Sequence, residues 1–248
     1  MKTQYHEQNM DVDTSSGKQN TLSHDNYYEI GVDEAGRGPL FGRLYVAAVV
    51  LPKEGEFCHE KMKDSKKFHS KKKIRDVADY IKANALAWSV DYVDADVIDQ
   101  INIRQAVFKG MHQAIQNTMH QMAAKQGETG NLNGPEPFLL IDGNDFQPIV
   151  KYNAATEEMT TIKHVTIEGG DNTYTAIAAA SILAKVAHDT YIEDMCVTYP
   201  ALIERYSLDT NVGYGTKKHL DGIREHGITQ WHRRTFGQHC RDAKLNTL

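Results

Sequence analysis

The chain has 248 residues, of which 40% are hydrophobic and 25% are charged, and its formal net charge is −5. This length suffices to bury a full core, and both fractions are ordinary for a globular protein. The longest apolar run covers residues 45–51, which is far too short to cross a bilayer, and the first residues lack the basic and then apolar pattern of a secretory signal. The sequence therefore argues against a membrane protein, and we expect no membrane partner.

The three cysteines carry information about the compartment. Cys58, Cys196 and Cys240 are odd in number and share no metal-binding spacing. This pattern favours free thiols in a reducing setting, so we expect a cytoplasmic protein. No segment indicates an obligate interface between subunits, and we therefore expect a monomer.

Taken in order, the chain begins with a polar extension. Residues 1–26 are rich in Gln, Asn, Ser, Thr and Asp and have almost no apolar periodicity, which predicts disorder. We assign this segment no function and expect residues 27–248 to form one domain. Within that domain we expect a helical C-terminal portion at about residues 200–248.

Strand-like and helical segments then alternate. Apolar or alternating runs predict strands at residues 28–33, 44–51, 87–93, 138–141 and 165–167. Stripes of helical period predict helices at residues 70–85, 102–125, 173–197 and 217–226, the first with Ser70 as its N-cap. Small side chains at residues 178–181 permit the third of these helices to pack closely on a sheet. The pattern predicts an α/β fold with a mixed central sheet flanked by helices.

Four carboxylates stand at strand ends or in the loops just beyond them: Asp33, Glu34, Asp142 and Asp171. If neighbouring strands carry the first three, their charges lie within several Å of one another, repel, and raise each other's pKa values. Divalent cations relieve this repulsion, and an oxygen-rich site without thiols suits Mg²⁺ or Mn²⁺. Two such ions can hold the attacking and leaving oxygens of a phosphodiester displacement.

A glycine turn follows the first two acids at once, with the sequence Gly36-Arg37-Gly38. The glycines let the backbone approach a ligand closely, and Arg37 suits a phosphate. A dinucleotide-binding turn is the other interpretation of such a motif. It fails here because Gly42 comes too late for the G-x-G-x-x-G spacing, and because the preceding acids would repel a pyrophosphate.

Basic side chains concentrate in two regions despite the negative total. The first contains Lys61, Lys63, Lys66, Lys67, Lys71, Lys72, Lys73 and Arg75, and the second contains Lys217, Lys218, Arg224, Arg233, Arg234 and Arg241. A lysine run alone is more often a solvated helix face. Two such regions on either side of a carboxylate cluster instead favour an anionic substrate that is held through metal ions.

Five sequence blocks carry a family resemblance. They are residues 30–40 (IGVDEAGRGPL), 64–67 (DSKK), 140–144 (LIDGN), 170–186 (from Gly170-Asp171 to IAAASILAKV) and 213–219 (GYGTKKH). In this order they resemble the motifs of ribonuclease HII, the type 2 ribonuclease H family. The resemblance implies a ribonuclease H-like fold with a helical C-terminal portion packed beside it.

The resemblance also implies roles for the acids. Asp33, Glu34, Asp142 and Asp171 match the family's four catalytic, metal-binding carboxylates, with Asp33 as the bridging ligand. Asp189 is the rival to Asp171, because the interval after Asp142 is long and includes the extra stretch 153–161.

Further positions match the family's substrate-binding residues. Gly36, Arg37 and Gly38 correspond to the motif that senses a ribose 2′-OH through backbone groups, and Tyr214 corresponds to the tyrosine that stacks on the next sugar. The candidates for phosphate contacts are Ser65, Lys66, Thr216, Lys217 and Lys218. His219 belongs to the last block, where we expect it to order the loop. The chain departs from the family at Phe41-Gly42-Arg43 and at His188, which stands where an arginine is common.

These features predict a metal-dependent endonuclease. It would cleave the RNA strand of RNA–DNA hybrids and incise duplex DNA 5′ of single ribonucleotides, leaving 5′-phosphate and 3′-hydroxyl ends. Two alternatives remain: a hybrid-binding module without catalysis, and a glycosidase with paired carboxylates. The complete set of acids argues against the first, and the two basic regions argue against the second.

Overall fold

The computed structural model describes residues 27–53, 57–62, 70–128, 135–153 and 157–247 of the chain. The predicted extension at residues 1–26 and the candidate residues Ser65 and Lys66 lie outside these ranges. None of the described helices is both long and apolar enough to span a membrane.

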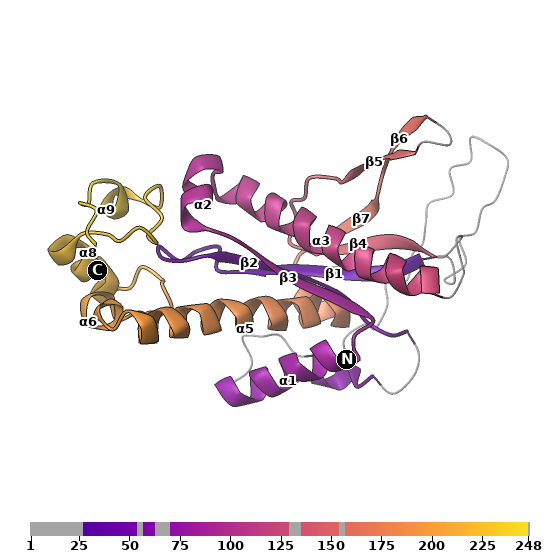
Figure 1. Cartoon of the computed structure of the whole chain (residues 1–248), viewed down its shortest axis with the longest axis horizontal. Coiled ribbons are helices and arrows are strands. Elements are labelled where there is room, and N and C mark those ends of the chain that lie inside the picture. The colour runs from indigo at the N-terminus through magenta and orange to yellow at the C-terminus, as the bar shows by residue number, and fades with distance from the viewer. Residues whose placement is uncertain (1–26, 54–56, 63–69, 129–134, 154–156, 248) are drawn as a thin grey trace.

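A five-stranded sheet forms the centre of the molecule, with strand order β3-β2-β1-β4-β7 (Figure 1). The strands are β1 (Tyr27–Ala35), β2 (Leu44–Val50), β3 (Ala87–Val93), β4 (Glu136–Asp142) and β7 (Lys163–Ile167). β2 pairs antiparallel with β1 and β3, whereas β4 pairs parallel with β1 and β7. The mixed sheet predicted from the sequence is therefore confirmed.

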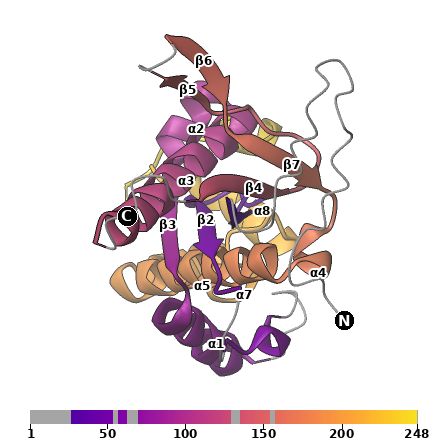
Figure 2. The ribbon, with the colours of Figure 1, turned by 90° about the vertical axis from the view of Figure 1, so that its right-hand side faces the viewer.

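Helices cover both faces of this sheet, which gives three layers (Figure 2). The short α2 (Ala95–Ile101) and the long α3 (Ile103–Glu128) lie on one side. On the other side lie α1 (Lys71–Asn84), the short α4 (Gly170–Thr173) and the long α5 (Thr175–Thr198). A 3-10 turn, η2 (His59–Lys61), precedes α1. The Ser70 side chain accepts a hydrogen bond from the Lys73 N–H, as expected of an N-cap.

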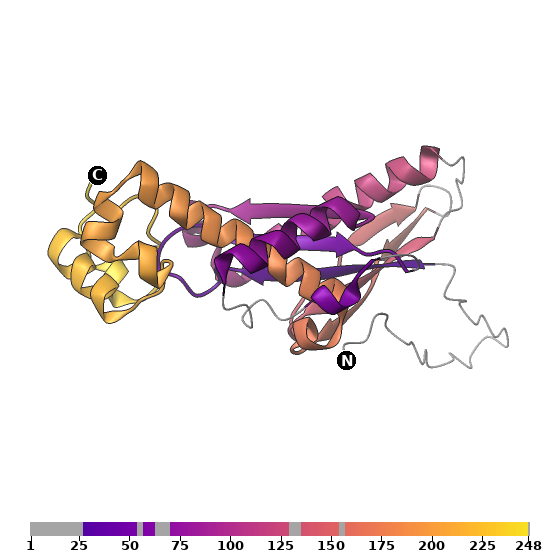
Figure 3. The same cartoon turned by 90° about the horizontal axis from the view of Figure 1, so that it is seen from below.

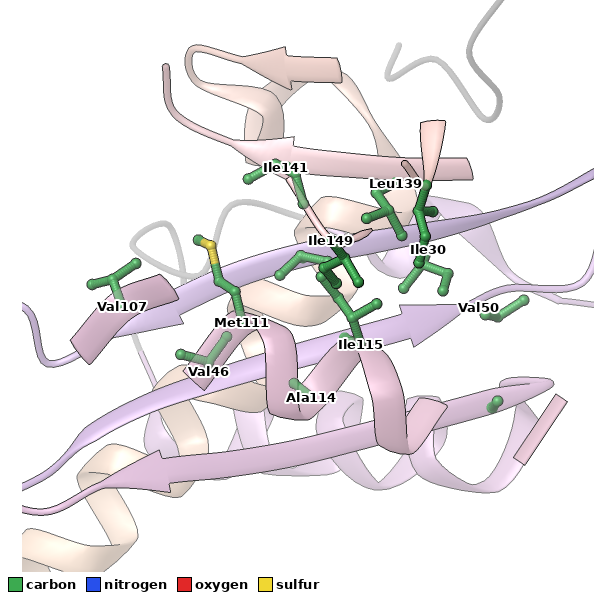
Figure 4. Packing of buried hydrophobic residues seen from close by; sticks show 14 of the residues in the cluster. Ile30, Val46, Val50, Val107, Met111, Ala114, Ile115, Leu139, Ile141 and Ile149 are labelled. Carbon is green, nitrogen blue, oxygen red and sulfur yellow. The ribbon is translucent and has the colours of Figure 1, made fainter. Parts of the chain in front are cut away.

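The larger core lies between the sheet and α3 (Figure 4). Ile30, Val46 and Leu139 from three strands pack against Met111 and Ile115 of the helix, and all five are at most 1% exposed. Burial on this scale is the main source of stability for such an interface. The helical stripe recognised in the sequence is thus the face that meets the sheet.

The contact between α5 and β1 is closer still, and Figure 3 shows α5 and α1 side by side across this face. A Cβ atom placed on Gly31 would lie 2.2 Å from the Ala176 carbonyl carbon, so only glycine fits there. Ala178, Ala179 and Ala180 are fully buried in the same layer. Small residues on both elements let the helix axis approach the strand, and this brings Ser181 to the end of β1.

The C-terminal helices form a separate, smaller core at the end of the sheet toward which β1 runs (Figure 1). They are α6 (Ala201–Tyr206), α7 (Leu208–Asn211), α8 (Lys217–His226) and α9 (Gln238–Arg241). Phe41, from the turn between β1 and β2, is fully buried among Tyr206, Ile223 and Cys240 of this portion. The turn after the two acids is therefore built into the C-terminal core.

The structure contains elements that the sequence did not predict. The stretch after Asp142 forms a separate hairpin of β5 (Val150–Asn153) and β6 (Glu158–Thr161), whose strands are only four residues long. A distinct α2 also precedes α3, because Asn102 adopts a positive φ of 66° and interrupts the helix.

Candidate active site

The first three acids meet at one end of the sheet. Val32 on β1 pairs with Ile141 on β4, so the next residues, Asp33 and Asp142, are neighbours on parallel strands. We expected the strand to break at the acids, but β1 continues to Ala35 in register with β2. Side chains along a strand alternate between its faces. Asp33 and Glu34 therefore extend to opposite sides of the sheet.

Each of the two adjacent acids contacts a different helix layer. Asp33 is 6% exposed and accepts a hydrogen bond from Ser181 of α5. Glu34 instead borders a pocket of about 140 Å³ on the α3 side, which we call the carboxylate pocket. The residues around this pocket are Glu34, Arg37, Arg104, Val107, Phe108, Met111, Asp142, Gly143, Asn144 and Asp145.

The electrostatics of this cluster follow from its burial. Burial raises the pKa of Asp33 well above its usual value, and the charges of Glu34 and Asp142 raise it further. Burial also raises the pKa of Glu34; Arg37 opposes this shift and Asp142 adds to it. Buried carboxylates that repel one another favour the uptake of a proton or of a cation.

Protein donors orient the carboxylates individually. The Glu34 N–H donates to Asp33 Oδ1 at 2.7 Å, and the Gly170 N–H donates to Asp142 Oδ1 at 2.7 Å. Arg37 Nη1 lies 3.5 Å from Glu34 Oε1. Within the described ranges, no three acidic, histidine or cysteine side chains are already arranged to hold a metal ion. The donor set is all oxygen, which fits Mg²⁺ or Mn²⁺, and side-chain rotation is needed to turn these oxygens toward a shared ion.

The fourth acid has two candidates in different surroundings. Asp171 is 5% exposed in α4 and follows Gly170, the residue that donates to Asp142. Asp189 lies on α5 and pairs with Lys185 at 2.8 Å and with His188 at 3.2 Å. Burial raises the pKa of Asp189, but the hydrogen bonds from His188 and Lys185 outweigh it and lower the value. The charge of Asp189 is thus already compensated within α5.

The predicted ribose-sensing turn lies next to the predicted stacking tyrosine. Gly36 has a φ of +84°, and a Cβ there would lie 2.5 Å from Cδ2 of His188, so glycine is required on both counts. A Cβ on Gly38 would lie 3.2 Å from Cε1 of Tyr214, whose side chain is 50% exposed. The chain therefore brings residues 36–38 and Tyr214, which are far apart in sequence, to one surface.

Arg233 holds the turn from behind. This arginine is fully buried, and its guanidinium donates to the Gly36 carbonyl at 2.7 Å, the Arg37 carbonyl at 3.2 Å and the Gly42 carbonyl at 2.9 Å. Burial lowers the pKa of Arg233 to about 10, which leaves it charged at neutral pH. Because the turn's carbonyls are engaged inward, its geometry is set before any substrate binds.

Two buried histidines, His219 and His232, are hydrogen-bonded to each other and fix the backbone at Tyr214. His232 Nδ1 accepts from the Thr229 N–H at 3.0 Å, so its proton belongs on Nε2, which lies 3.1 Å from His219 Nε2. The remaining proton of His219 is then on Nδ1, which donates to the Tyr214 carbonyl at 3.0 Å. Burial lowers the pKa of His232 to about 3, so the pair stays neutral. His219 orders the loop, as expected.

The predicted contact residues that the structure describes beyond Tyr214 lie at the start of α8. The Thr216 hydroxyl caps the helix by accepting from the His219 N–H, Lys217 pairs with Asp221 at 2.8 Å, and Lys218 is exposed. In the first basic region, Lys71 and Arg75 both pair with Glu193. Part of the basic charge seen in the sequence is therefore neutralised within the fold.

Sequence reasoning missed the positioning role of Arg233 and the pairing of Arg104 with Asp145. Arg233 was counted only as surface charge in the second basic region. Its neighbours Trp231 and Phe236 are the one local signal that an arginine in this segment has apolar surroundings. No sequence pattern joins residue 104 to residue 145.

The three-layer fold with acids at the ends of β1 and β4 defines a ribonuclease H-like protein. Solved structures agree: ribonuclease H2 from Pyrococcus horikoshii aligns with a TM-score of 0.58 and 22% identity over 87% of this chain and 96% of that one. Bst-RNase HIII in complex with Mn²⁺ aligns with a TM-score of 0.53 and 18% identity, over 82% and 63% of the two chains.

The family model for ribonuclease HII matches residues 30–239. The ribonuclease HII of Parabacteroides distasonis is 42% identical over 208 residues, which are 84% of this chain and 89% of that protein. That of Bacteroides thetaiotaomicron is 41% identical over 218 residues, or 88% and 93% of the two. The chain belongs to the ribonuclease HII family and is a hydrolytic endonuclease of the ribonuclease H class. This assignment excludes the glycosidase and argues against the non-catalytic binding module.

Proposed function

We propose that the protein is a divalent-metal-dependent ribonuclease that cleaves the RNA strand of RNA–DNA hybrids and also incises duplex DNA 5′ of a single ribonucleotide. The products are 5′-phosphate and 3′-hydroxyl ends. One observation carries the proposal: three mutually repelling carboxylates stand beside a rigid glycine turn and a half-exposed tyrosine. The first group suits phosphodiester chemistry and the second suits recognition of a sugar.

Asp33, Glu34, Asp142 and Asp171 are the residues that would hold Mg²⁺ or Mn²⁺, with Asp33 as the shared ligand. Bound there, a pair of cations supplies an activated water and neutralises charge on the scissile phosphate. The protein's own contribution is to gather the acids at one strand end, to fix Asp33 through Ser181, and to fix Asp142 through the Gly170 N–H. Asp171 takes the fourth position because it follows Gly170, whose N–H donates to Asp142, whereas Asp189 lies on α5 and pairs there with Lys185 and His188.

Recognition of the ribose falls to the turn and the tyrosine. Arg233 engages the carbonyls of Gly36 and Arg37 on the buried side of the turn. The exposed backbone at Arg37 and Gly38 is then available to a 2′-hydroxyl, which is the group that separates RNA from DNA. Tyr214 packs against Gly38 and offers a flat surface for the following sugar. Thr216, Lys217 and Lys218 lie beyond it as candidates for phosphate contacts. Ser65 and Lys66, which lie outside the described residues, are candidates from the sequence alone.

The test is strand incision of three duplexes: an RNA–DNA hybrid, a DNA duplex with one ribonucleotide, and an all-DNA duplex. The parent protein should cut the first two with Mg²⁺ or Mn²⁺ present, stop with EDTA, and leave the third intact. Asp33→Asn should lose about 10³-fold in rate. Asp79→Asn, which makes the same charge change at an exposed position of α1, is the matched control. Cleavage with EDTA present, or equal cleavage by Asp33→Asn, would contradict the mechanism.

The cellular setting is also part of the proposal. Cys58, Cys196 and Cys240 are free thiols in the fold, which suits the reducing cytoplasm. There a monomeric enzyme of this kind would remove ribonucleotides from DNA during replication and repair. Light scattering at working concentration tests the monomer, for which we expect the mass of one chain.

A further inference from the structure

A second arginine borders the carboxylate pocket from the α3 side. Arg104 stands in the first turn of α3, which starts after Asn102 interrupts the preceding helix and caps the Gln105 N–H at 3.1 Å. The pocket it borders also contains Glu34 and Asp142 of the candidate catalytic cluster. No motif of the sequence analysis includes Arg104 or assigns it a role.

The Arg104 guanidinium is held in a defined place. Its Nε donates to Asp145 Oδ2 at 2.6 Å and its Nη2 donates to Asp145 Oδ1 at 2.9 Å, so the two groups meet as a two-pronged pair. The guanidinium carbon also lies 4.8 Å from the centroid of the buried Phe108 ring. The side chains of Arg104 and Asp145 nevertheless remain 57% and 39% exposed. The pair is ordered and at the same time accessible to a ligand.

Two ion pairs border the pocket. Arg37 pairs with Glu34 on one side, and Arg104 pairs with Asp145 on the other. Asp145 on its own would repel a phosphate that approached the cluster, and the arginine masks this charge. The charge of Arg37 acts on Asp145 as well, since it helps to lower the pKa of this carboxyl after the larger effect of Arg104.

We propose that Arg104 binds a backbone phosphate of the nucleic-acid substrate, and that Asp145 holds the guanidinium in place until the phosphate replaces the carboxylate. This inference rests on the nuclease function proposed above. The planar fork that binds two carboxylate oxygens presents the same two donors to two phosphate oxygens. Exposed ion pairs add little net stability, so the exchange costs little.

The exchange defines what the contact contributes. A phosphate contact positions a duplex but carries no information about base or sugar. Arg104 should therefore act on KM and on the salt dependence of binding, and it should act equally on the hybrid and on the single-ribonucleotide duplex. The ribose selectivity should stay with the turn at residues 36–38.

Steady-state cleavage of the hybrid in Mg²⁺, measured over a range of KCl concentrations, tests this role. Arg104→Gln should raise KM about fivefold, change kcat less than twofold, and reduce the salt slope by about 0.7 to 0.9, the loss of one phosphate contact. Lys109→Gln is the matched control, because Lys109 is an exposed cation on the same helix and does not border the pocket. It should leave KM and the slope near the parent values.

Asp145→Asn separates exchange from simple repulsion. If Arg104 contacts the phosphate directly, Arg104→Gln should still raise KM about fivefold in the Asp145→Asn background, whereas an arginine that only masks the Asp145 charge should cause no rise there. No rise in the Asp145→Asn background, or a KM for Arg104→Gln equal to that of the parent, overturns the proposal. Absence of Mg²⁺-dependent cleavage by the parent would instead refute the underlying nuclease function, so the two failures are distinguishable.

Discussion

The two halves of the site solve opposite electrostatic problems. At the ends of β1 and β4, negative charges are buried together, and the pKa of Asp33 is raised by burial and by its neighbours. In the turn behind Gly36, one buried positive charge on Arg233 is matched by three carbonyl oxygens. The charge in the turn is balanced by the protein's own carbonyl groups, whereas the carboxylates would be balanced by the proposed cations. Asp33, which we assign to catalysis, and Gly36, where Arg233 stabilises the turn, are thus only three positions apart in the sequence.

The largest expected effect concerns which aspartate, Asp171 or Asp189, is the fourth carboxylate of the proposed metal site. Asp171→Asn should lower kcat at least 100-fold, because it removes a ligand from the proposed ions. Asp189→Asn should change kcat less than about threefold, because the Asp189 carboxylate pairs with the Lys185 and His188 side chains. Single-turnover cleavage of the hybrid measures both variants. The reverse order of effects would assign the fourth position to Asp189.

In the turn, substitution of Arg233 should lower the stability of the fold. Arg233→Ala leaves buried carbonyls without donors and should cost about 3 kcal/mol in the free energy of unfolding. For a chain of this size that corresponds to a fall in Tm of roughly 6–12 °C. Arg233→Lys keeps the charge and should recover part of the loss. Calorimetry gives the Tm values, and the ratio of incision on ribonucleotide-containing and all-DNA duplexes tells whether the turn still selects ribose.

Tyr214 tests the same half without disturbing its core. Its side chain is 50% exposed, so Tyr214→Ala should leave Tm nearly unchanged and raise KM about tenfold, as expected for the loss of one stacking contact. Tyr214→Phe keeps the ring and should resemble the parent. If Tyr214→Ala lowers Tm as much as Arg233→Ala does, the tyrosine is structural and the proposed stacking role is wrong.

The smallest expected effect is a pH-dependent change in Tm that arises from the buried carboxylate of Asp33. Because the pKa of Asp33 is higher in the fold than in the unfolded chain, its contribution to stability is fully present below the unfolded pKa and is lost as pH rises through the folded pKa. Without metal, Asp33→Asn should therefore match the parent near pH 4 and melt roughly 2–4 °C higher at pH 8, the shift expected for about 1 kcal/mol.

Added Mn²⁺ should reverse this order. The ion stabilises the folded state in proportion to its affinity for the intact cluster, so the parent should gain more Tm than Asp33→Asn. If the Tm difference between the parent and Asp33→Asn without metal is the same at pH 4 and pH 8, ionisation of Asp33 does not destabilise the fold.

Some features of the fold and of the site could be predicted from the sequence, whereas others could not. The helix at residues 217–226 and the strand at residues 87–93 agree with α8 and β3 at both ends, because Thr216 caps the helix and the strand alternates. The meeting of Asp33 with Asp142 was predictable from parallel strands that end in acids. These features are local, or they follow from simple sheet geometry.

The rest depends on contacts that no local pattern encodes. The strand continues past Asp33 because Glu34 and Ala35 pair with β2, a tertiary effect. Arg233 looks like any other residue of a basic segment until the fold buries it. The strands of the hairpin formed by β5 and β6 have only four residues each, too few for an alternating pattern to indicate a strand.

The hydrogen bond from Arg233 to the Gly36 carbonyl joins residues 197 positions apart. During translation, the strand that bears the acids emerges long before its turn can close. A nascent or prematurely terminated chain that ends before residue 233 therefore has its acids but not the fixed turn that would tell RNA from DNA. If the proposed role of the turn is right, selectivity for ribose would develop late in synthesis, and a truncated chain would lack it.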